Sequence, residues 1–147
     1  MQLNTFTDYS LRVLIYAAVR REQRCMAAEA AAAFGVSRHH IIKVIHTLQR
    51  LGYLETTRGR GGGFRLAQDP ERIRIGDVVR HTEGTLALAE CFAGDVNRCP
   101  LTPACGLKGV LHEAVDAFFG VLDQWTVADL VARRRMVTLV NGLGGVA

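Results

Sequence analysis

Three cysteines lie within fifteen residues of one another in the second half of the chain, and clustered thiols bind metals or undergo redox chemistry. Cys91, Cys99 and Cys105 follow the spacing C-x7-C-x5-C. This is neither the C-x2-4-C pair of zinc knuckles nor the C-x2-C-x2-C run of ferredoxins. Three widely spaced thiolates can converge on a group larger than one ion, which favours an iron–sulfur cluster. Zinc, a Cys99–Cys105 disulfide switch or simple packing are the alternatives.

The fourth donor of such a cluster does not follow from the spacing. A cuboidal cluster bound by three cysteines has one iron without a thiolate ligand. Cys25 is remote in the sequence, and we expect it to be a small buried hydrophobic residue. The fourth donor must then be a carboxylate, a histidine or water.

Length and composition indicate a small globular protein. The chain has 147 residues, 49% hydrophobic and 22% charged, which fits one domain, or a small domain with an appended dimerisation element. No apolar run approaches the roughly 20 residues of a membrane-spanning helix. Asp8 and Arg12 interrupt the segment where a signal peptide would have its apolar stretch. We therefore expect a cytoplasmic protein without a membrane partner.

Positive charge is concentrated in the first half of the chain. Residues 1–80 carry 13 Lys and Arg against 7 Asp and Glu, whereas residues 81–147 carry 5 against 7. Of the 18 basic residues, only Lys43 and Lys108 are lysines. An arginine-rich, basic half is typical of proteins with a polyanionic partner such as nucleic acid, although a solvated surface has the same balance.

The first half carries the pattern of a winged helix-turn-helix. Hydrophobic periodicity predicts helices over residues 8–20, 27–34, 38–51 and 75–83, and strands over 53–57 and 64–67 around the Gly-rich loop 58–63. Gly35 permits a tight turn, and Ser37 is expected to cap the following helix. An ordinary αα-hairpin is the alternative. The basic loop favours a mainly α fold with a small β-wing, whose DNA-binding domain spans residues 1–85.

The helix after Gly35 is expected to enter the major groove of double-stranded operator DNA. Its exposed N-terminal part would then contact bases or phosphates through Ser37, Arg38, His39, His40 and Lys43. The wing would reach phosphates or the minor groove through Arg58, Arg60 and Arg65. Arg38 and Lys43 are equally compatible with solvated surface charges.

The second half is predicted to contain a cysteine loop, residues 86–106, and a dimerisation helix region, residues 107–132. An apolar stripe runs over more than four helical turns and consists of Leu107, Val110, Leu111, Ala114, Val115, Phe118 and Leu122. It predicts packing against a second copy in a homodimer, and an intramolecular core helix is the alternative. The basic, then Gly-rich tail over residues 133–147 predicts partial disorder.

Several segments resemble one known family, in the order in which that family has them. They are MQLNTFTDYSLRVLIYAA, FGVSRHHIIKVIHTLQRLGY, RGRGGGFRL, IRIGDVV, and CPLTPACGLKGVL followed by TVADLV. Together they resemble the nitric-oxide-sensing repressors of the Rrf-two (BadM-type) winged-helix family over about residues 1–132. The resemblance implies a homodimeric, iron–sulfur-dependent repressor that releases operator DNA when nitric oxide nitrosylates its cluster.

The resemblance also implies a ligand set. Cys91, Cys99 and Cys105 match the family's cluster cysteines, and the TDY motif implies Asp8, supplied by the partner subunit, as the fourth ligand of a [4Fe-4S] cluster. The alternative role for Asp8 is to cap the first helix. In a sibling group, a histidine three residues after the last cysteine completes a [2Fe-2S] site. Lys108 occupies that position here, which argues against membership of that sibling group, while a [2Fe-2S] cluster stays the alternative cofactor.

The sequence departs from the family pattern in two respects, and two rival functions remain. The gap between Cys91 and Cys99 is longer than in several relatives, and neither His81 nor His112 matches a family ligand position. A winged-helix regulator using zinc or a disulfide switch is one rival. An iron–sulfur electron-transfer protein is the other, but it would leave the basic wing without a role. We expect no enzyme, because the sequence shows neither a nucleophile–base constellation nor a phosphate-binding loop.

Overall fold

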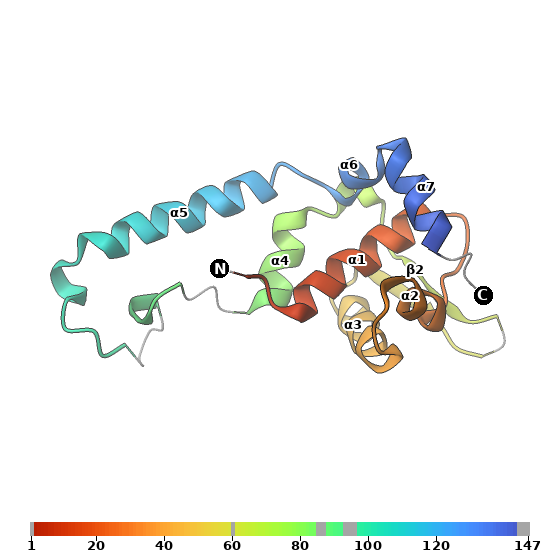
Figure 1. Ribbon diagram of the computed structural model, residues 1–147, viewed down its shortest axis with the longest axis horizontal. Helices are drawn as coiled ribbons and strands as arrows, with labels where there is room; N and C mark the ends of the chain where they lie inside the picture. Colours follow the sequence, from red (N-terminus) through yellow and green to blue (C-terminus); the bar gives the residue numbers. More distant parts are fainter. Residues whose placement is uncertain (1, 60, 85–87, 93–96, 144–147) are drawn as a thin grey trace.

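Helix α1 (Thr5–Val19) lies at the centre of the winged domain in this computed structural model, which describes residues 2–59, 61–84, 88–92 and 97–143 (Figure 1). It contacts α3, α4, α6 and α7. The side chain of Asn4 caps α1 by accepting a hydrogen bond from the Thr7 N–H at 2.7 Å. The helix therefore begins three residues before the predicted start at Asp8, and the N-cap alternative for Asp8 is wrong.

Helices α2 (Ala27–Phe34) and α3 (Arg38–Arg50) form the helix-turn-helix, within one residue of the predicted bounds. Gly35 ends α2 with a φ of 64°, a left-handed conformation that favours glycine. The Val36 N–H bonds the Ala31 carbonyl at 3.0 Å and closes the turn. Ser37 occupies the N-cap position of α3 as predicted. Its side chain makes no capping bond, and its carbonyl accepts from the His40 N–H instead.

Strands β1 (Leu54–Thr57) and β2 (Gly63–Leu66) pair antiparallel and form the predicted wing. Leu54 faces Leu66, and Glu55 faces Arg65 across the hairpin. Phe64 and Cys25 exchange two backbone hydrogen bonds, at 2.8 and 2.9 Å, which hold the wing against the chain before α2. Cys25 is 1% exposed, so the prediction that it is a small buried residue is confirmed.

The C-terminal part of the chain returns to the winged domain. Helix α4 (Ile75–Glu83) follows a short 3-10 turn, η1 (Pro70–Arg72). The segment before α6 (Val127–Val131) pairs with it, because the Ile75 N–H bonds the Trp125 carbonyl and the Val127 N–H bonds the Ile73 carbonyl, both at 2.9 Å. The hydrophobic core therefore extends beyond residue 85 and includes Val127.

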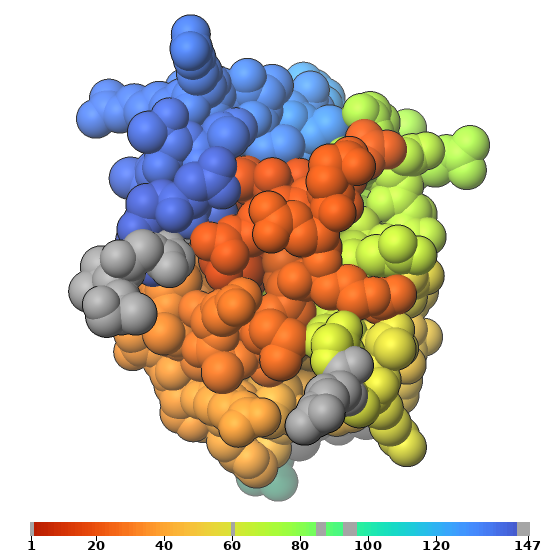
Figure 2. All heavy atoms as spheres, turned by 90° about the vertical axis from the view of Figure 1, so that its right-hand side faces the viewer, coloured from red at the N-terminus to blue at the C-terminus, as the bar shows by residue number. Residues whose placement is uncertain are grey.

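The tail contains a helix, α7 (Arg134–Leu143), where we predicted partial disorder. Met136 and Val140, one turn apart, pack on the core, and Val140 is 3% exposed. Figure 2 shows α7, in blue, against the red-orange and orange segments of α1 and α2, which it contacts. The glycines and arginines of the tail outweighed this short apolar stripe in the sequence-based prediction.

Helix α5 (Gly106–Leu122) projects away from the winged domain (Figure 1), and none of its residues is buried. Among the described residues before α5 are two short 3-10 turns, η2 (Glu90–Phe92) and η4 (Thr102–Ala104). Only its C-terminal end packs on the core, through Phe118, Phe119 and Leu122. The predicted fold class, mainly α with a small β-wing, is confirmed. In the described part of the chain, no helix is long and apolar enough to cross a membrane.

Candidate nucleic-acid interface and cysteine loop

The outer face of α3 presents the residues predicted to contact DNA. Its inner face is buried through Ile41, Val44, Ile45 and Leu48, which fixes the rotation of the helix about its axis. The residues left exposed include all five predicted on this helix: Ser37, Arg38, His39, His40 and Lys43. The structure therefore leaves all five side chains accessible.

His40 and Lys43 also line a surface hollow of about 340 Å³ between α1 and α3. Its other walls include Phe6, Tyr9 and Val44, so the hollow is largely apolar. The rings of His40 and Tyr9 lie 6.4 Å apart between their centroids. His40 is therefore in contact with α1, whereas Arg38 and His39 face outward at the start of the helix.

The two wing arginines that the structure describes, Arg58 and Arg65, do not share one surface. Arg58 is exposed at the end of β1, beside the second half of α3. Arg65 lies on the opposite face of the hairpin, where it donates a hydrogen bond to Glu55 in an ion pair. Arg60 lies outside the described residues. The structure thus brings Arg58, and not Arg65, next to the predicted recognition helix.

A groove between α3 and the wing contains residues that the sequence analysis missed. Its volume is about 680 Å³, and its walls are His46, Gln49, Arg50, Thr56, Thr57 and Arg58. His39, Lys43, His46 and Arg50 follow one another at steps of four, three and four residues. Such steps place side chains on one face of a helix, so this periodicity was the available signal.

The three predicted cluster cysteines lie at successive points of the loop before α5. Cys91 is in η2, and Cys105 immediately precedes α5. Cys99 lies between them, after residues 93–96, which are outside the described part of the chain. All are partly exposed free thiols. The loop around Cys99 is ordered by side-chain hydrogen bonds: Asn97 Oδ1 accepts from the Cys99 N–H at 3.0 Å, and Thr102 Oγ1 donates to the Cys99 carbonyl at 2.9 Å.

The donor set suits an iron–sulfur cluster in its chemistry. Three free thiols on one loop, next to the N-terminal N–H groups of a long helix, favour a negatively charged thiolate-bound group. Their positions are not those of a closed site. Over residues 2–59, 61–84, 88–92 and 97–143, no three His, Cys, Asp or Glu side chains are grouped so as to hold a metal ion.

Asp8 lies in the first turn of α1 and forms an ion pair with Arg12, with an O–N distance of 2.6 Å. Its side chain is 43% exposed and lines a surface hollow with Gln2, Leu3, Thr5 and Leu11. The structure does not group Asp8 with the cysteines of its own chain. The carboxylate is thus accessible from outside the protomer, and its present partner is a neighbouring arginine.

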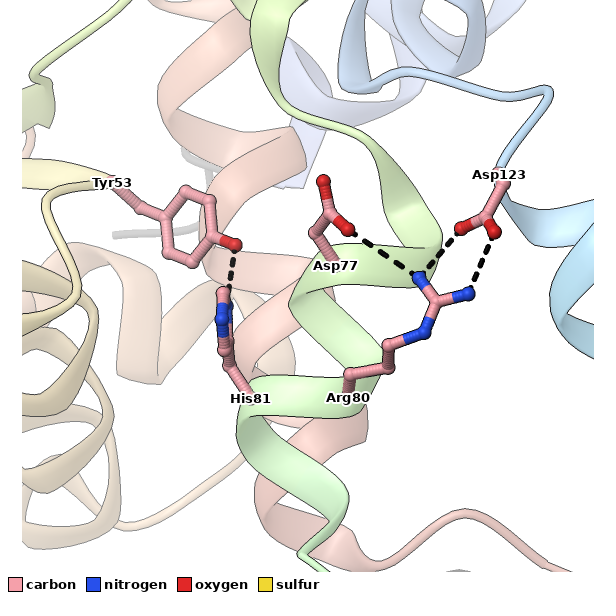
Figure 3. Close-up of polar contacts among 5 residues, drawn as sticks. All are labelled: Tyr53, Asp77, Arg80, His81 and Asp123. Carbon is pink, nitrogen blue, oxygen red and sulfur yellow. Dashed lines mark hydrogen bonds and ion pairs between the residues drawn. The ribbon is translucent and has the colours of Figure 1, made fainter.

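Two histidines outside the expected ligand set have packing roles. The Tyr53 hydroxyl and His81 Nδ1 form a hydrogen bond of 2.8 Å, which connects α4 to the start of the wing (Figure 3). Burial raises the pKa of Tyr53 to about 12, so the phenol stays protonated. His112 of α5 lies against Phe92 of η2, with 4.6 Å between ring centroids.

Comparison with known proteins decides the class of this chain. Residues 3–133 match the family model Rrf2, described as an iron-dependent transcriptional regulator. The chain belongs to the Rrf2 family. The predicted resemblance is thereby confirmed at the level of the family, and this Rrf2 protein is a transcriptional regulator rather than an enzyme.

Individual relatives are similar over most of the chain. The HTH-type transcriptional regulator NsrR of Geobacillus kaustophilus is 51% identical over 135 residues, which is 91% of this chain and 92% of that protein. The NsrR regulator of Bacillus subtilis is 49% identical over the same shares. Similarity at this level over both lengths includes the winged domain and the cysteine loop of this Rrf2 regulator.

Solved structures share the fold. T. potens IscR superimposes with a TM-score of 0.70 at 23% identity, over 90% of this chain and 87% of that one. The oxidised form of Staphylococcus aureus CymR gives a TM-score of 0.73 at 24% identity, over 90% and 98%. At this identity the likeness concerns the fold alone, and the fold it supports is the winged helix with a projecting α5.

Proposed function

We propose that this Rrf2 regulator is a homodimeric repressor that binds a palindromic operator while its iron–sulfur cluster is intact. On reaction with nitric oxide it would release the DNA. The observation that carries the proposal is the set of three free thiols, Cys91, Cys99 and Cys105, on one loop next to a helix without buried residues. A regulator that binds chromosomal DNA would act in the cytoplasm.

The exposed apolar face of α5 supports the homodimer. Leu107, Val110 and Val121 are 61%, 62% and 57% exposed in the single chain. Soluble proteins rarely leave such a stripe open on a projecting helix. A second copy of α5 covers it by the self-complementary contact of a two-fold dimer. The two α3 helices are then spaced to read two half-sites of double-stranded operator DNA.

Cys91, Cys99 and Cys105 would hold a [4Fe-4S] cluster, with Asp8 of the partner subunit as fourth ligand. When bound, the cluster supplies iron that reacts with nitric oxide, most readily where the ligand is a carboxylate, because oxygen is a weaker donor to iron than thiolate sulfur. The accessible position of Asp8 on α1 supports its role as a donor to another chain. A [2Fe-2S] cluster is the alternative that iron and sulfide analysis would distinguish.

Helices α1, α3 and α5 would transmit the loss of the Asp8 ligand from the cluster to the DNA-binding surface. Asp8 lies on α1, which contacts α3, and the cysteine loop leads directly into α5. A ligand shared between two subunits therefore ties the winged domain of one protomer to the dimer region of the other. Releasing Asp8 removes that tie and lets the recognition helices leave the operator spacing.

The DNA side of the proposal rests on Ser37, Arg38, His39, His40 and Lys43 of α3 and on Arg58, Arg60 and Arg65 of the wing. All of these residues that the structure describes are exposed, which supports their contact with DNA. Arg65 is expected to contribute least, because it already forms an ion pair with Glu55. Replacing Arg58 and Arg60 together by alanine is expected to weaken operator binding at fixed salt. Unchanged affinity would reject a DNA-contacting wing.

Anaerobic purification followed by operator-binding assays with and without nitric oxide tests the proposal. A brown protein with iron and acid-labile sulfide that loses DNA binding with nitric oxide is expected. A colourless zinc protein, or a reversible Cys99–Cys105 disulfide, would instead support the rival redox regulators. Serine at Cys91, Cys99 and Cys105 is expected to abolish the nitric oxide response, and variants that keep it would contradict cluster-based sensing.

A further inference from the structure

We propose that the groove between the second half of α3 and the wing binds one phosphate of the DNA backbone, with Arg50 and Arg58 as its two charges. This deepens the proposed function, on which it rests, by naming residues that hold a duplex irrespective of its sequence. Contacts to phosphate position a protein on DNA, whereas contacts to base edges specify the site.

The lining of the groove has the chemistry of an anion site. Its six residues are polar or cationic, and none carries a carboxylate. Arg50 and Arg58 supply permanent charge, and Thr57 supplies a hydroxyl donor. A phosphate in this groove would therefore meet positive charge and several hydrogen-bond donors, and no negative charge, from the lining side chains.

The two arginines also differ from several others on the surface in their partners. Arg50 donates a hydrogen bond to the Thr47 hydroxyl at 3.4 Å, which leaves its charge in place. Arg12, Arg21, Arg65 and Arg80 each form an ion pair with an aspartate or glutamate. In the part of the chain that the structure describes, neither Arg50 nor Arg58 has such a partner. Their charge is therefore not neutralised by the described residues and can replace the counterions of a phosphate.

A direct contact fixes the width of the groove. The Thr56 hydroxyl donates to Gln49 Oε1 at 2.9 Å and joins β1 to α3 across the floor. Because the amide oxygen is used in this way, the Nε2 group of Gln49 keeps its N–H donors for a ligand. The wing loop is folded tightly beside Arg58, since a Cβ on Gly62 would lie 2.4 Å from the Thr57 carbonyl oxygen.

The position of Arg50 along α3 matches the edge of a DNA groove. His39 and Arg50 are separated by eleven residues, which corresponds to about 16 Å at a rise of about 1.5 Å per residue. The major groove of B-DNA is about 12 Å wide. When the start of α3 contacts bases in that groove, Arg50 lies beyond its edge, where the backbone runs between α3 and the wing.

The test uses the full-length protein, purified anaerobically, and two duplexes of equal length. One is an operator selected by this protein from a random pool, and the other has random sequence. Fluorescence anisotropy between about 50 and 200 mM salt gives the affinity and its salt dependence. The variants are Arg50→Gln and Arg58→Gln. Arg72→Gln on η1 is the matched control, because it removes the same charge from an exposed position outside the groove.

Each groove variant is expected to weaken binding to both duplexes by a similar factor, about eightfold per protomer at about 0.1 M salt. The slope of log affinity against log salt should fall by about 0.9 per protomer, while Arg72→Gln stays close to the wild type. If both groove variants keep the wild-type affinity and salt dependence, the proposed phosphate site in the groove is wrong, while the proposed repressor function is unaffected. A loss confined to the operator would also overturn the phosphate site, since that result indicates base contact. A wild-type protein that binds neither duplex would overturn the proposed function as well.

Discussion

Arg80 of α4 makes two parallel hydrogen bonds to the carboxylate of Asp123, at 2.7 and 2.6 Å, at the point where α5 ends (Figure 3). The same guanidinium lies over the ring of Phe119, 4.3 Å from its centroid. The hydrogen bonds lower the pKa of Asp123 and raise that of Arg80, so both groups stay charged. This contact fixes the direction in which α5 leaves the winged domain.

Gly76→Ala should disturb that contact without unfolding the protein. A Cβ at Gly76 would lie 1.9 Å from Asp123 Oδ1, so the carboxylate has to move away from Arg80. We expect operator affinity to fall about fivefold or more, because the two recognition helices lose their fixed spacing. Gly109→Ala is the control, since its Cβ meets no atom within 4 Å. Anisotropy measurements that give equal affinity for the two variants would show that the contact has no role in DNA binding.

Tyr53→Phe should destabilise the winged domain. The Tyr53 hydroxyl is the partner of His81 Nδ1 in a largely buried place, and its loss is expected to lower the unfolding free energy by about 1 kcal/mol. Urea denaturation of the cluster-free protein at neutral pH measures the change. Tyr9→Phe is a matched control on α1. Equal stability of Tyr53→Phe and the wild type would mean that the bond contributes nothing.

Stability should also decline in alkaline solution. The folded pKa of Tyr53 is raised by burial from 10.0 to about 12, so the folded state binds more protons than the unfolded state between these values. Unfolding free energy is therefore lost as pH rises through this window. Cys25, with its pKa raised by burial from 9.0 to about 11, adds the same effect at lower pH. Urea titrations of Tyr53→Phe should show a shallower decline than the wild type above pH 10, and parallel curves would contradict the assignment.

One of the four thiols should react slowly with an alkylating reagent, and the other three should react quickly. Cys25 is 1% exposed and its pKa is raised to about 11, whereas the three loop cysteines are partly exposed. Thiolate is the species that reacts, so alkylation of the cluster-free protein should modify Cys91, Cys99 and Cys105 well before Cys25. Mass spectrometry at timed intervals, with unfolded protein as the reference, follows each site. Early labelling of Cys25 would mean that β2 separates readily from the chain before α2.

Charged substitutions on α5 should weaken the proposed dimer. Leu107→Glu or Val110→Glu places a carboxylate on the exposed apolar stripe, and dimer affinity is expected to fall about tenfold or more. Gly120→Glu is the control, because an added side chain there points into open space. Sedimentation velocity over a range of protein concentrations gives the dissociation constant. Dimers of unchanged affinity in both stripe variants would place the interface elsewhere.

Local patterns were sufficient to predict the helix-turn-helix and the wing. The bounds of α2 and α4 were predicted to the residue, because each has a hydrophobic stripe and an end set by a neighbouring glycine. The start of α1 was missed because Asn4 was not recognised as its cap. α7 was missed because two apolar residues that pack on a distant part of the core carry little weight in a Gly-rich tail.

The site was predicted less completely, since it depends on contacts between elements. Arg65 was grouped with Arg58 by sequence distance, although the alternation of side chains along a strand places it beside Glu55. Arg50 and Gln49 became candidates only when α3 was seen beside β1. Cys91, Cys99 and Cys105 were singled out by their spacing and Asp8 by the family resemblance alone, and their role as cluster ligands stays a prediction.

The backbone pairing of residues 73–75 with residues 125–127 closes the DNA-reading body on itself. The chain leaves this body after α4 and re-enters it before α6, so the cysteine loop and α5 form an excursion between two fixed points. The cysteine loop and α5 are thus an insertion within the winged domain rather than an appendage at its end. Its length and chemistry can change in evolution while the module that recognises DNA keeps both of its ends.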